Sequence, residues 1–175
     1  PHQLFEYYRM VKNASSSISV PFVVCETGFN GGHSASLFLE ANKNVIYYGW
    51  DLGIYSAAKP MAIKMNEEIY PGRVHVSWGN SKIQLPTFFE QHPNMICDFV
   101  SIDGEHSEAG VQSDISTLVS HVRSGGLIVV DDCASPYSGI MKSYLKFVSN
   151  GKIEHLKWFK NINMGSPGFC VGRFI

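Results

Sequence analysis

The chain has 175 residues, of which 45% are hydrophobic and 17% are charged, and its formal net charge is -1. This composition excludes an intrinsically disordered chain, and the length fits one domain. Its continuous apolar runs are shorter than the roughly 20 residues of a transmembrane helix, so we expect a soluble globular protein without a membrane partner. No Lys or Arg cluster marks a nucleic-acid surface, which leaves a small molecule as the expected partner.

Four cysteines, Cys25, Cys97, Cys133 and Cys170, are widely separated along the chain. They lack the CxxC spacing of zinc and redox sites. We therefore expect reduced, buried thiols and a cytoplasmic protein. The chain begins at Pro1 and shows no signal-peptide pattern, which is compatible with an excised domain. Short sheet edges and exposed aromatic residues would permit a homo-oligomer.

Apolar strand-like runs alternate with amphipathic helical runs from about residue 20 to residue 148. This alternation is typical of an α/β protein with a parallel sheet and helices on both faces. Residues 1–19 are expected to form a helix and loop that cover the sheet or the substrate entrance, and 20–175 a single domain. The pattern predicts strands at 20–25, 45–50, 73–78, 98–102 and 125–130, and helices around 36–40, 57–70, 85–91, 111–122 and 140–148.

The end of the chain differs from this alternation. Two further strand-like runs, 153–159 and 169–174, are separated by a short segment. A parallel crossover needs a dozen or more residues, so these two strands are predicted to form an antiparallel hairpin.

Acidic residues follow two of the predicted strands directly. Asp103 comes after the run 98–102, and Asp131 and Asp132 come after 125–130. Neighbouring strand ends would bring the three carboxylates together, where they would repel one another unless a cation compensates. A hard divalent metal such as Mg²⁺ is the expected occupant. The alternative is that these acids cap the helices that follow.

A glycine-rich turn, residues 26–34, follows the first predicted strand. Such a turn before a helix directs backbone N–H groups at a ligand. Its glycine spacing differs from GxGxxG, which disfavours a dinucleotide with a pyrophosphate. Glu26 would repel a phosphate but suits an ammonium group, and Asp51 ends the second strand, where ribose hydroxyls are bound in such folds. The two acids favour a ligand with a ribose and an amino group and without phosphates.

These motifs together resemble the class I S-adenosylmethionine-dependent methyltransferases over nearly the whole chain. The resemblance is carried by Glu26-Thr27-Gly28, Asp51, Gly79-Asn80-Ser81, Asp103 and the terminal hairpin. It implies a Rossmann-like, doubly wound sheet of seven mostly parallel strands with an antiparallel last strand. Within that class, the sequence Asp-Gly-Glu-His at 103–106 followed by 125–132 is similar to the metal-dependent small-molecule O-methyltransferases, which include catechol-type and sugar or antibiotic enzymes.

The resemblance also implies roles for individual residues. Glu26, Gly28 and Ser34 would lie around the methionine part of the cofactor, Asp51 at its ribose, and Trp78, Asn80 and Ser81 near its adenine. Asn30 and His33 belong to the same turn and are candidates for the same site. Asp103 would border the cofactor and, with Asp131 and Asp132, hold Mg²⁺. Catechol-type enzymes have Asn as the third ligand and Lys as the base, whereas this chain has Asp132 and His106, so the acceptor class stays open.

His106 is the candidate general base. A hydroxyl group is a poor nucleophile until it loses its proton, and His106 lies three residues beyond Asp103. An unperturbed histidine titrates near pH 6.5, which suits a base at neutral pH. The alternative is a histidine that begins a helix and binds the backbone. Two other functions stay open: a nicotinamide-dependent oxidoreductase on a similar sheet, and a cofactor-binding module without turnover.

Overall fold

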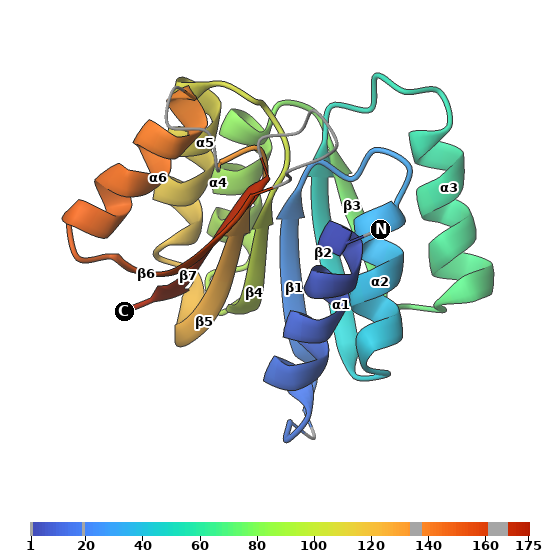
Figure 1. Cartoon of the computed structure of the whole chain (residues 1–175). Helices are drawn as coiled ribbons and strands as arrows, with labels where there is room; N and C mark the ends of the chain where they lie inside the picture. The colour runs from blue at the N-terminus through green and yellow to red at the C-terminus, as the bar shows by residue number, and fades with distance from the viewer. Residues whose placement is uncertain (1, 19, 134–137, 161–167) are drawn as a thin grey trace.

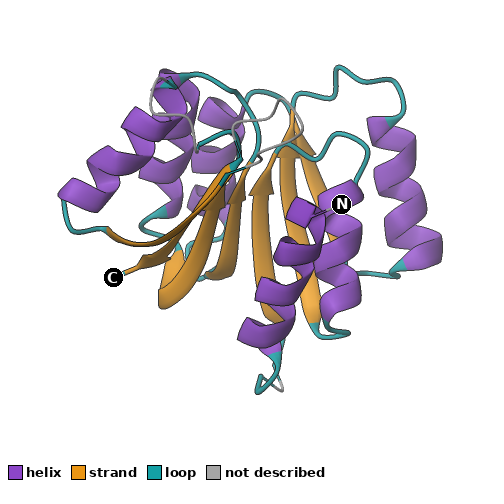
Figure 2. Ribbon diagram, viewed as in Figure 1, coloured by secondary structure: helices purple, strands orange, loops and turns teal. Residues whose placement is uncertain are grey.

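A computed structural model describes residues 2–18, 20–133, 138–160 and 168–175. It shows a twisted sheet between two layers of helices (Figure 2). The strands are β1 (Phe22–Thr27), β2 (Val45–Asp51), β3 (Val74–Trp78), β4 (Cys97–Ile102), β5 (Val122–Val130), β6 (Ile153–Phe159) and β7 (Phe169–Phe174). The helices are α1 (His2–Ser15), α2 (His33–Ala41), α3 (Ala58–Lys64), α4 (Ser81–Gln91), α5 (Glu108–Leu118) and α6 (Gly139–Ser149), with a π-helical turn, η1 (Met65–Ile69), after α3.

The sheet confirms the predicted class I methyltransferase topology. Its strand order is β3-β2-β1-β4-β5-β7-β6. The first five strands pair in parallel, whereas β7 is antiparallel to both β5 and β6 (Figure 1). Strand β4 is buried along its whole length, which explains why it appears in the sequence as an uninterrupted apolar run. The carboxyl ends of β1 to β5 therefore meet along one edge of the sheet.

Each face of the sheet has its own hydrophobic core. Side chains of α1, α2 and α3 pack on one face, with Val11, Phe38 and Ala58 among the buried residues. Helices α4, α5 and α6 cover the other face, where Leu85 and Ile115 are fully buried. Two covered faces are what a parallel sheet requires, since its strands have no solvent-facing side.

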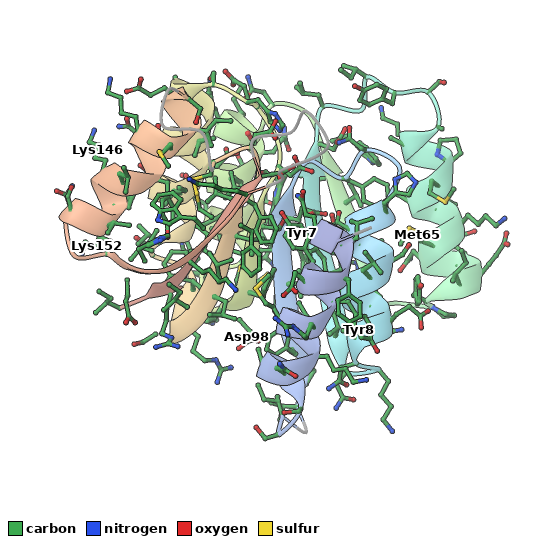
Figure 3. The ribbon with its side chains drawn as sticks, viewed as in Figure 1. Tyr7, Tyr8, Met65, Asp98, Lys146 and Lys152 are labelled. Carbon is green, nitrogen blue, oxygen red and sulfur yellow. A yellow bond between two sulfur atoms is a disulfide. The ribbon has the colours of Figure 1, made fainter. Side chains whose placement is uncertain are left out.

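Helix α1 is anchored to the sheet by one aromatic residue. Tyr7 is only 3% exposed and points from α1 toward the sheet (Figure 3). Its ring lies 5.0 Å from the ring of Phe169 on β7, edge to face, and 6.0 Å from that of Phe38 on α2. The N-terminal residues thus cover the sheet as expected, and the first residues of α1 lie near the edge formed by the strand carboxyl ends (Figure 1).

The boundary between α5 and β5 differs from the prediction. Val122 was expected at the end of the helix around 111–122, with the strand beginning only at the glycine pair 125–126, but it is the first residue of β5 and pairs with Cys97. The register then shifts, because five residues of β5 stand against two of β4 before Phe99 meets Leu127. The glycines lie in this bulge, where a side chain at Gly126 would approach the Asp98 carbonyl oxygen to 2.9 Å. A glycine pair therefore marks a strand irregularity here and not a helix end.

Two helices also have ends that the apolar pattern does not reveal. Helix α4 begins at Ser81, earlier than expected, because the side chain of Asn80 accepts a hydrogen bond from the Lys82 backbone N–H and caps it. The helix expected over 57–70 is α-helical only to Lys64. Its last turn is η1, where the Tyr70 N–H reaches the Met65 carbonyl, and the Tyr70 hydroxyl donates to Glu40 on α2.

The prediction of reduced cysteines is wrong. Disulfides join Cys25 to Cys97 and Cys133 to Cys170, and no cysteine is free. The first bond links β1 to β4, and the second links the segment after β5 to β7. Sequence spacing did not reveal these pairs, because the partners lie in or directly after strands that neighbour in the sheet but are 72 and 37 residues apart in the chain. The cysteine argument for a cytoplasmic protein therefore fails.

None of the helices in the described part of the chain has the length and apolar character that crossing a bilayer would require.

The disulfides predict a simple chemical result. Unfolded but unreduced protein should show no thiol reactive toward a colorimetric thiol reagent, and reduction should release four. Replacing Cys133 and Cys170 by Ser should lower the free energy of unfolding by about 4 kcal/mol, since the bond closes a loop of 37 residues in the unfolded chain. Urea unfolding of the wild-type protein and of the Ser variant measures this loss of stability, and urea unfolding with reductant measures the effect of breaking both disulfides. Four thiols titrating before reduction would contradict the pairing.

Candidate active site

A cavity of about 390 Å³ opens at the carboxyl edge of the sheet. This volume lies in the usual range of roughly 300–1,000 Å³ for small-molecule pockets. Its walls come from the ends of β1, β2, β3 and β4 and the loops after them. The lining residues are Thr27, Gly28, Asn30, Trp50, Asp51, Leu52, Ile54, Tyr55, Gly79, Asn80, Ser81, Asp103, Gly104, Glu105 and His106. Seven of the predicted site residues are among them: Gly28, Asn30, Asp51, Asn80, Ser81, Asp103 and His106.

Backbone hydrogen bonds continue beyond the strands and fix the start of each loop. The Gly28 N–H donates to the Trp50 carbonyl at 2.8 Å, and the Asp103 N–H donates to the Thr27 carbonyl at 2.9 Å. The Asp131 N–H donates to the Ile102 carbonyl at 2.9 Å. The turn after β1 and the acids after β4 and β5 are therefore held in one continuous network.

Gly28 brings two of these loops into direct backbone contact. Its φ is +93°, and a Cβ there would lie 1.9 Å from the carbonyl oxygen of Asp103. Only glycine avoids both the conformational strain and the collision. The sequence predicted a glycine for close approach to a ligand, and the structure adds that the glycine is needed for the approach of β4.

Asp51 is oriented by two backbone donors. The N–H of Asn30 donates to its Oδ2 at 2.9 Å, and the N–H of Gly53 donates to its Oδ1 at 2.6 Å. Asn30 adopts a left-handed φ of 48°, which turns its N–H toward Asp51. The carboxylate is thus held at the pocket wall with its orientation fixed by the glycine-rich turn.

Glu26 is fully buried beneath this turn. Its Oε2 accepts hydrogen bonds from the Tyr47 hydroxyl at 2.7 Å and the Ser34 hydroxyl at 2.8 Å, while its Oε1 has no hydrogen-bond partner among the described residues. Burial, and after it the negative charge of Asp103, raise the pKa of Glu26 to about 8 against the lowering effect of the hydroxyls of Tyr47, Ser34 and Ser101. The side chain is therefore an acid with one oxygen left to accept a donor.

His106 connects two of the predicted metal ligands. Its Nε2 lies 3.1 Å from Oδ1 of Asp103, and its Nδ1 lies 3.1 Å from Oδ2 of Asp132. The hydrogen bond to Asp103 and the negative charges of Asp103, Asp132 and Asp131 raise the pKa of His106 to about 9. In this arrangement the imidazole is protonated at neutral pH and acts as the cation between two carboxylates.

Asp131 receives a contact from the N-terminal helix. The Gln3 side-chain amide donates to Asp131 Oδ1 at 2.6 Å and to the Tyr7 hydroxyl at 3.0 Å. Burial first, and then the charge of Asp103, raise the pKa of Asp131 to about 7. Its neighbour Asp132 adopts a left-handed φ of 51°. The acidic pair is therefore crowded, partly buried and held in a strained turn.

The residue types of the acidic cluster, Asp103, Asp131 and Asp132, suit a hard divalent cation, but their side chains are not arranged around one common point. Three carboxylates at adjoining strand ends are the donors that Mg²⁺ prefers. In the described part of the chain, however, no three His, Cys, Asp or Glu side chains are arranged so that they could hold one metal ion. The carboxylates of Asp103 and Asp132 both contact His106 instead.

Several predicted cofactor residues lie outside the cavity wall. Ser34 contacts Glu26, and His33 is exposed at the start of α2. Trp78 packs edge-on against Phe29, and Trp50 lines the cavity in its place. The sequence assigned Trp78 to the adenine, but the two tryptophans end neighbouring strands, and their positions in the sequence do not distinguish which ring lines the cavity. Tyr137, which follows the acidic pair in the sequence and is a candidate for the acceptor pocket, lies outside the described residues.

Two residues near the site were not predicted. Gln3 was missed because a contact across 128 residues leaves no local pattern. Asp114 lies on α5 and is only 1% exposed behind the cavity wall. The sequence did carry a signal for Asp114, since it interrupts the apolar stripe that includes Val111, Ile115 and Leu118.

The fold and the pocket together define a class I S-adenosylmethionine-dependent methyltransferase. The chain belongs to the methyltransferase domain family, whose match covers residues 25–133. No curated protein matches the sequence.

Solved structures of O-methyltransferases share this fold at low sequence identity. An O-methyltransferase from Bacillus cereus in complex with S-adenosylhomocysteine has a TM-score of 0.81 and 16% identity, over 100% of this chain and 81% of that one. TomG from Streptomyces achromogenes, involved in tomaymycin synthesis and solved with S-adenosylmethionine, has a TM-score of 0.78 and 16% identity over 98% and 79%. CalS11, the TDP-rhamnose 3'-O-methyltransferase of calicheamicin biosynthesis, has a TM-score of 0.73 and 14% identity over 99% and 80%.

The raised pKa values predict that the ligand-free protein loses stability as the pH rises. A group whose pKa is higher in the folded state binds its proton more tightly there, so folding is favoured below the unfolded-state pKa and less favoured above it. The windows are 4.5 to about 8 for Glu26, 3.8 to about 7 for Asp131 and 6.5 to about 9 for His106. Urea unfolding across this range should show a continuous decline.

Glu26→Gln should reduce the loss of stability between pH 4.5 and about 8, because the amide keeps the volume of the side chain and cannot ionise. Glu90→Gln, at an exposed position of α4, is the matched control and should leave the slope as it is. A Glu26→Gln protein with the full wild-type slope would contradict the raised pKa of Glu26.

Proposed function

We propose that this protein transfers a methyl group from S-adenosylmethionine to a hydroxyl group of a small acceptor, with Mg²⁺ at the acidic cluster and His106 as the general base. The observation that carries the proposal is that His106 and Asp103 lie at the wall of the same cavity as the glycine-rich turn and Asp51. The proposed base His106 and its partner Asp103 thus lie in the same cavity as the residues proposed to bind the nucleoside.

The cofactor part of the proposal is supported by the charges of the site. The free oxygen of Glu26 is buried beside the turn and suits the ammonium group of the methionine part. Asp51, held by two backbone N–H groups, can accept hydrogen bonds from ribose hydroxyls. Asn80 and Ser81 line the region where the adenine would lie. A phosphate-bearing dinucleotide would meet these carboxylates with the wrong charge.

The acceptor part depends on how the proton of His106 is released. A divalent cation held by Asp103, Asp131 and Asp132 would supply positive charge that lowers the pKa of an acceptor hydroxyl and neutralises the carboxylates that raise the pKa of His106. With those charges compensated, the pKa of His106 would return toward its ordinary value near 6.5, and the imidazole could accept the hydroxyl proton. Bound S-adenosylmethionine would supply the methyl group to the acceptor oxygen, with S-adenosylhomocysteine as the leaving product and the proton held on His106.

The small-molecule acceptor is supported by the pocket and by the solved structures with this fold. The cavity has the size of a small-molecule site, and the exposed apolar residues Leu52, Ile54 and Tyr55 stand at its rim. TomG and CalS11 are named as enzymes of small-molecule biosynthesis. Methyl transfer from labelled S-adenosylmethionine to a panel of phenols, catechols and nucleotide sugars would identify the acceptor class.

Calorimetry with S-adenosylhomocysteine and with NAD tests the cofactor. We expect binding of the first and none of the second. Gly28→Ala should weaken S-adenosylhomocysteine binding by at least roughly tenfold, about 1.4 kcal/mol, because the new methyl group displaces the end of β4. Gly72→Ala is the control, since Gly72 has a φ of +71° but open space around it, and it should cost stability without affecting affinity. Tight binding of NAD would contradict the proposal.

The metal and the base can be tested together by NMR titration of the imidazoles. The pKa of His106 should be about 9 in EDTA and should fall on saturation with Mg²⁺, because the cation compensates the adjoining carboxylates. His75, an exposed residue of β3 whose ring stacks on Tyr48, is the control for general effects, and its signal should not respond to Mg²⁺.

Asp131→Asn should weaken Mg²⁺ binding while S-adenosylhomocysteine binding persists. His106→Ala should abolish methyl transfer. A His106 pKa that does not respond to Mg²⁺, together with turnover in EDTA, would replace this proposal by a metal-independent reaction.

A further inference from the structure

Asp114 presents a buried carboxylate with unused hydrogen-bonding capacity. It lies on the inner face of α5, between the apolar residues Val111 and Ile115, and is 1% exposed. Neither of its carboxylate oxygens has a hydrogen-bond partner among the described residues. An ion in such surroundings costs stability, whereas an apolar side chain of similar size would not.

The groups around Asp114 belong to the loops that form the cavity. The hydroxyls of Thr27 and Ser81 are close enough to lower the pKa of Asp114 against the rise that burial causes, although neither completes a hydrogen bond to it. A Cβ at Gly104 would lie 3.6 Å from Asp114 Oδ2 and 3.2 Å from Thr27 Oγ1. Thr27, Ser81 and Gly104 follow or end three different strands, and all three line the cavity.

The charges that face Asp114 come from the same loops. Glu105 raises its pKa and Lys82 lowers it, and these two residues form an ion pair of 2.7 Å between the start of α4 and the loop after β4. Asp114 therefore lies where three segments meet. These are the end of β1 with its turn, the start of α4 and the loop after β4.

We infer that Asp114 is a positioning residue of the cofactor site, which receives the Thr27 and Ser81 hydroxyls when S-adenosylmethionine fills the cavity and so locks the three loops around it. The inference rests on the proposed function for the identity of the cofactor. It explains why a costly buried acid occupies a position on the inner face of α5 between the apolar residues Val111 and Ile115. Oxygens that accept no hydrogen bond from the described residues can form new hydrogen bonds when the loops close, and these bonds would stabilise the closed arrangement.

Binding of S-adenosylhomocysteine to Asp114→Leu, Asp114→Asn and wild-type protein tests this, with thermal unfolding of each ligand-free protein. Asp114→Leu should unfold at the wild-type temperature or above it, because the unpaired acid is gone, yet bind at least roughly tenfold more weakly. Asp114→Asn should recover most of the lost affinity, since its carbonyl oxygen still accepts both hydroxyls.

Asp98→Asn is the matched control. Asp98 is a buried acid at the opposite end of β4 that accepts from the Val23 N–H and pairs with Arg123, so its loss should lower stability without changing affinity. Wild-type affinity in Asp114→Leu, or no recovery in Asp114→Asn, would overturn the inference. If wild-type protein itself did not bind S-adenosylhomocysteine, the proposed function would fail instead.

If Asp114→Leu does not fold, a double-mutant cycle of Ser81→Ala and Asp114→Ala, with affinity for S-adenosylhomocysteine as the measured quantity, tests the inference. Overlapping losses of affinity are expected from residues that act as one unit, and additive losses would overturn the inference.

Discussion

The contact of Gly28 with the carbonyl of Asp103 is the constraint on which the site depends. It lets the backbone of the β1 turn lie directly on the end of β4, closer than any side chain would allow. The turn that would hold the cofactor and the loop that carries the acid and the histidine are thereby fixed relative to each other. Hydrogen bonds from Gly28 to β2 and from Asp131 to β4 extend the same alignment across four strands.

The parts of this arrangement that depend on strand ends could be predicted from the sequence. Apolar runs that stop at Asp51, Asp103 and Asp131 indicate buried parallel strands, and the carboxyl ends of such strands share one edge. The short link between the last two runs was enough to predict the hairpin. These signals are local, because a buried strand has to be apolar along its own length whatever its neighbours are.

The parts that were missed depend on contacts between distant segments. The disulfides pair cysteines that lie in or directly after neighbouring strands, and Gln3 on α1 reaches Asp131 after β5. Neither kind of contact produces a recognisable spacing in the sequence. The start of β5 was misplaced because its glycines serve a bulge against β4 that only the pairing reveals. Trp50, and not Trp78, lines the cavity, although both end strands at the same edge of the sheet. The difference depends on the residues that each ring packs against, which are Phe88 for Trp50 and Phe29 for Trp78.

The charge of the site explains which ligand it can accept. Five acids, namely Glu26, Asp51, Asp103, Asp131 and Asp132, gather around the sheet edge, and the imidazole of His106 lies between the carboxylates of Asp103 and Asp132. Part of this negative charge is suppressed by proton uptake, as the raised pKa values of Glu26 and Asp131 show. A ligand that brings an ammonium group, a sulfonium or a divalent cation exchanges those protons for its own positive charge, so its binding tightens as the pH rises through these values. A pyrophosphate would add to the repulsion. The same carboxylates, crowded at one sheet edge, would thus favour cationic ligands over phosphorylated ones.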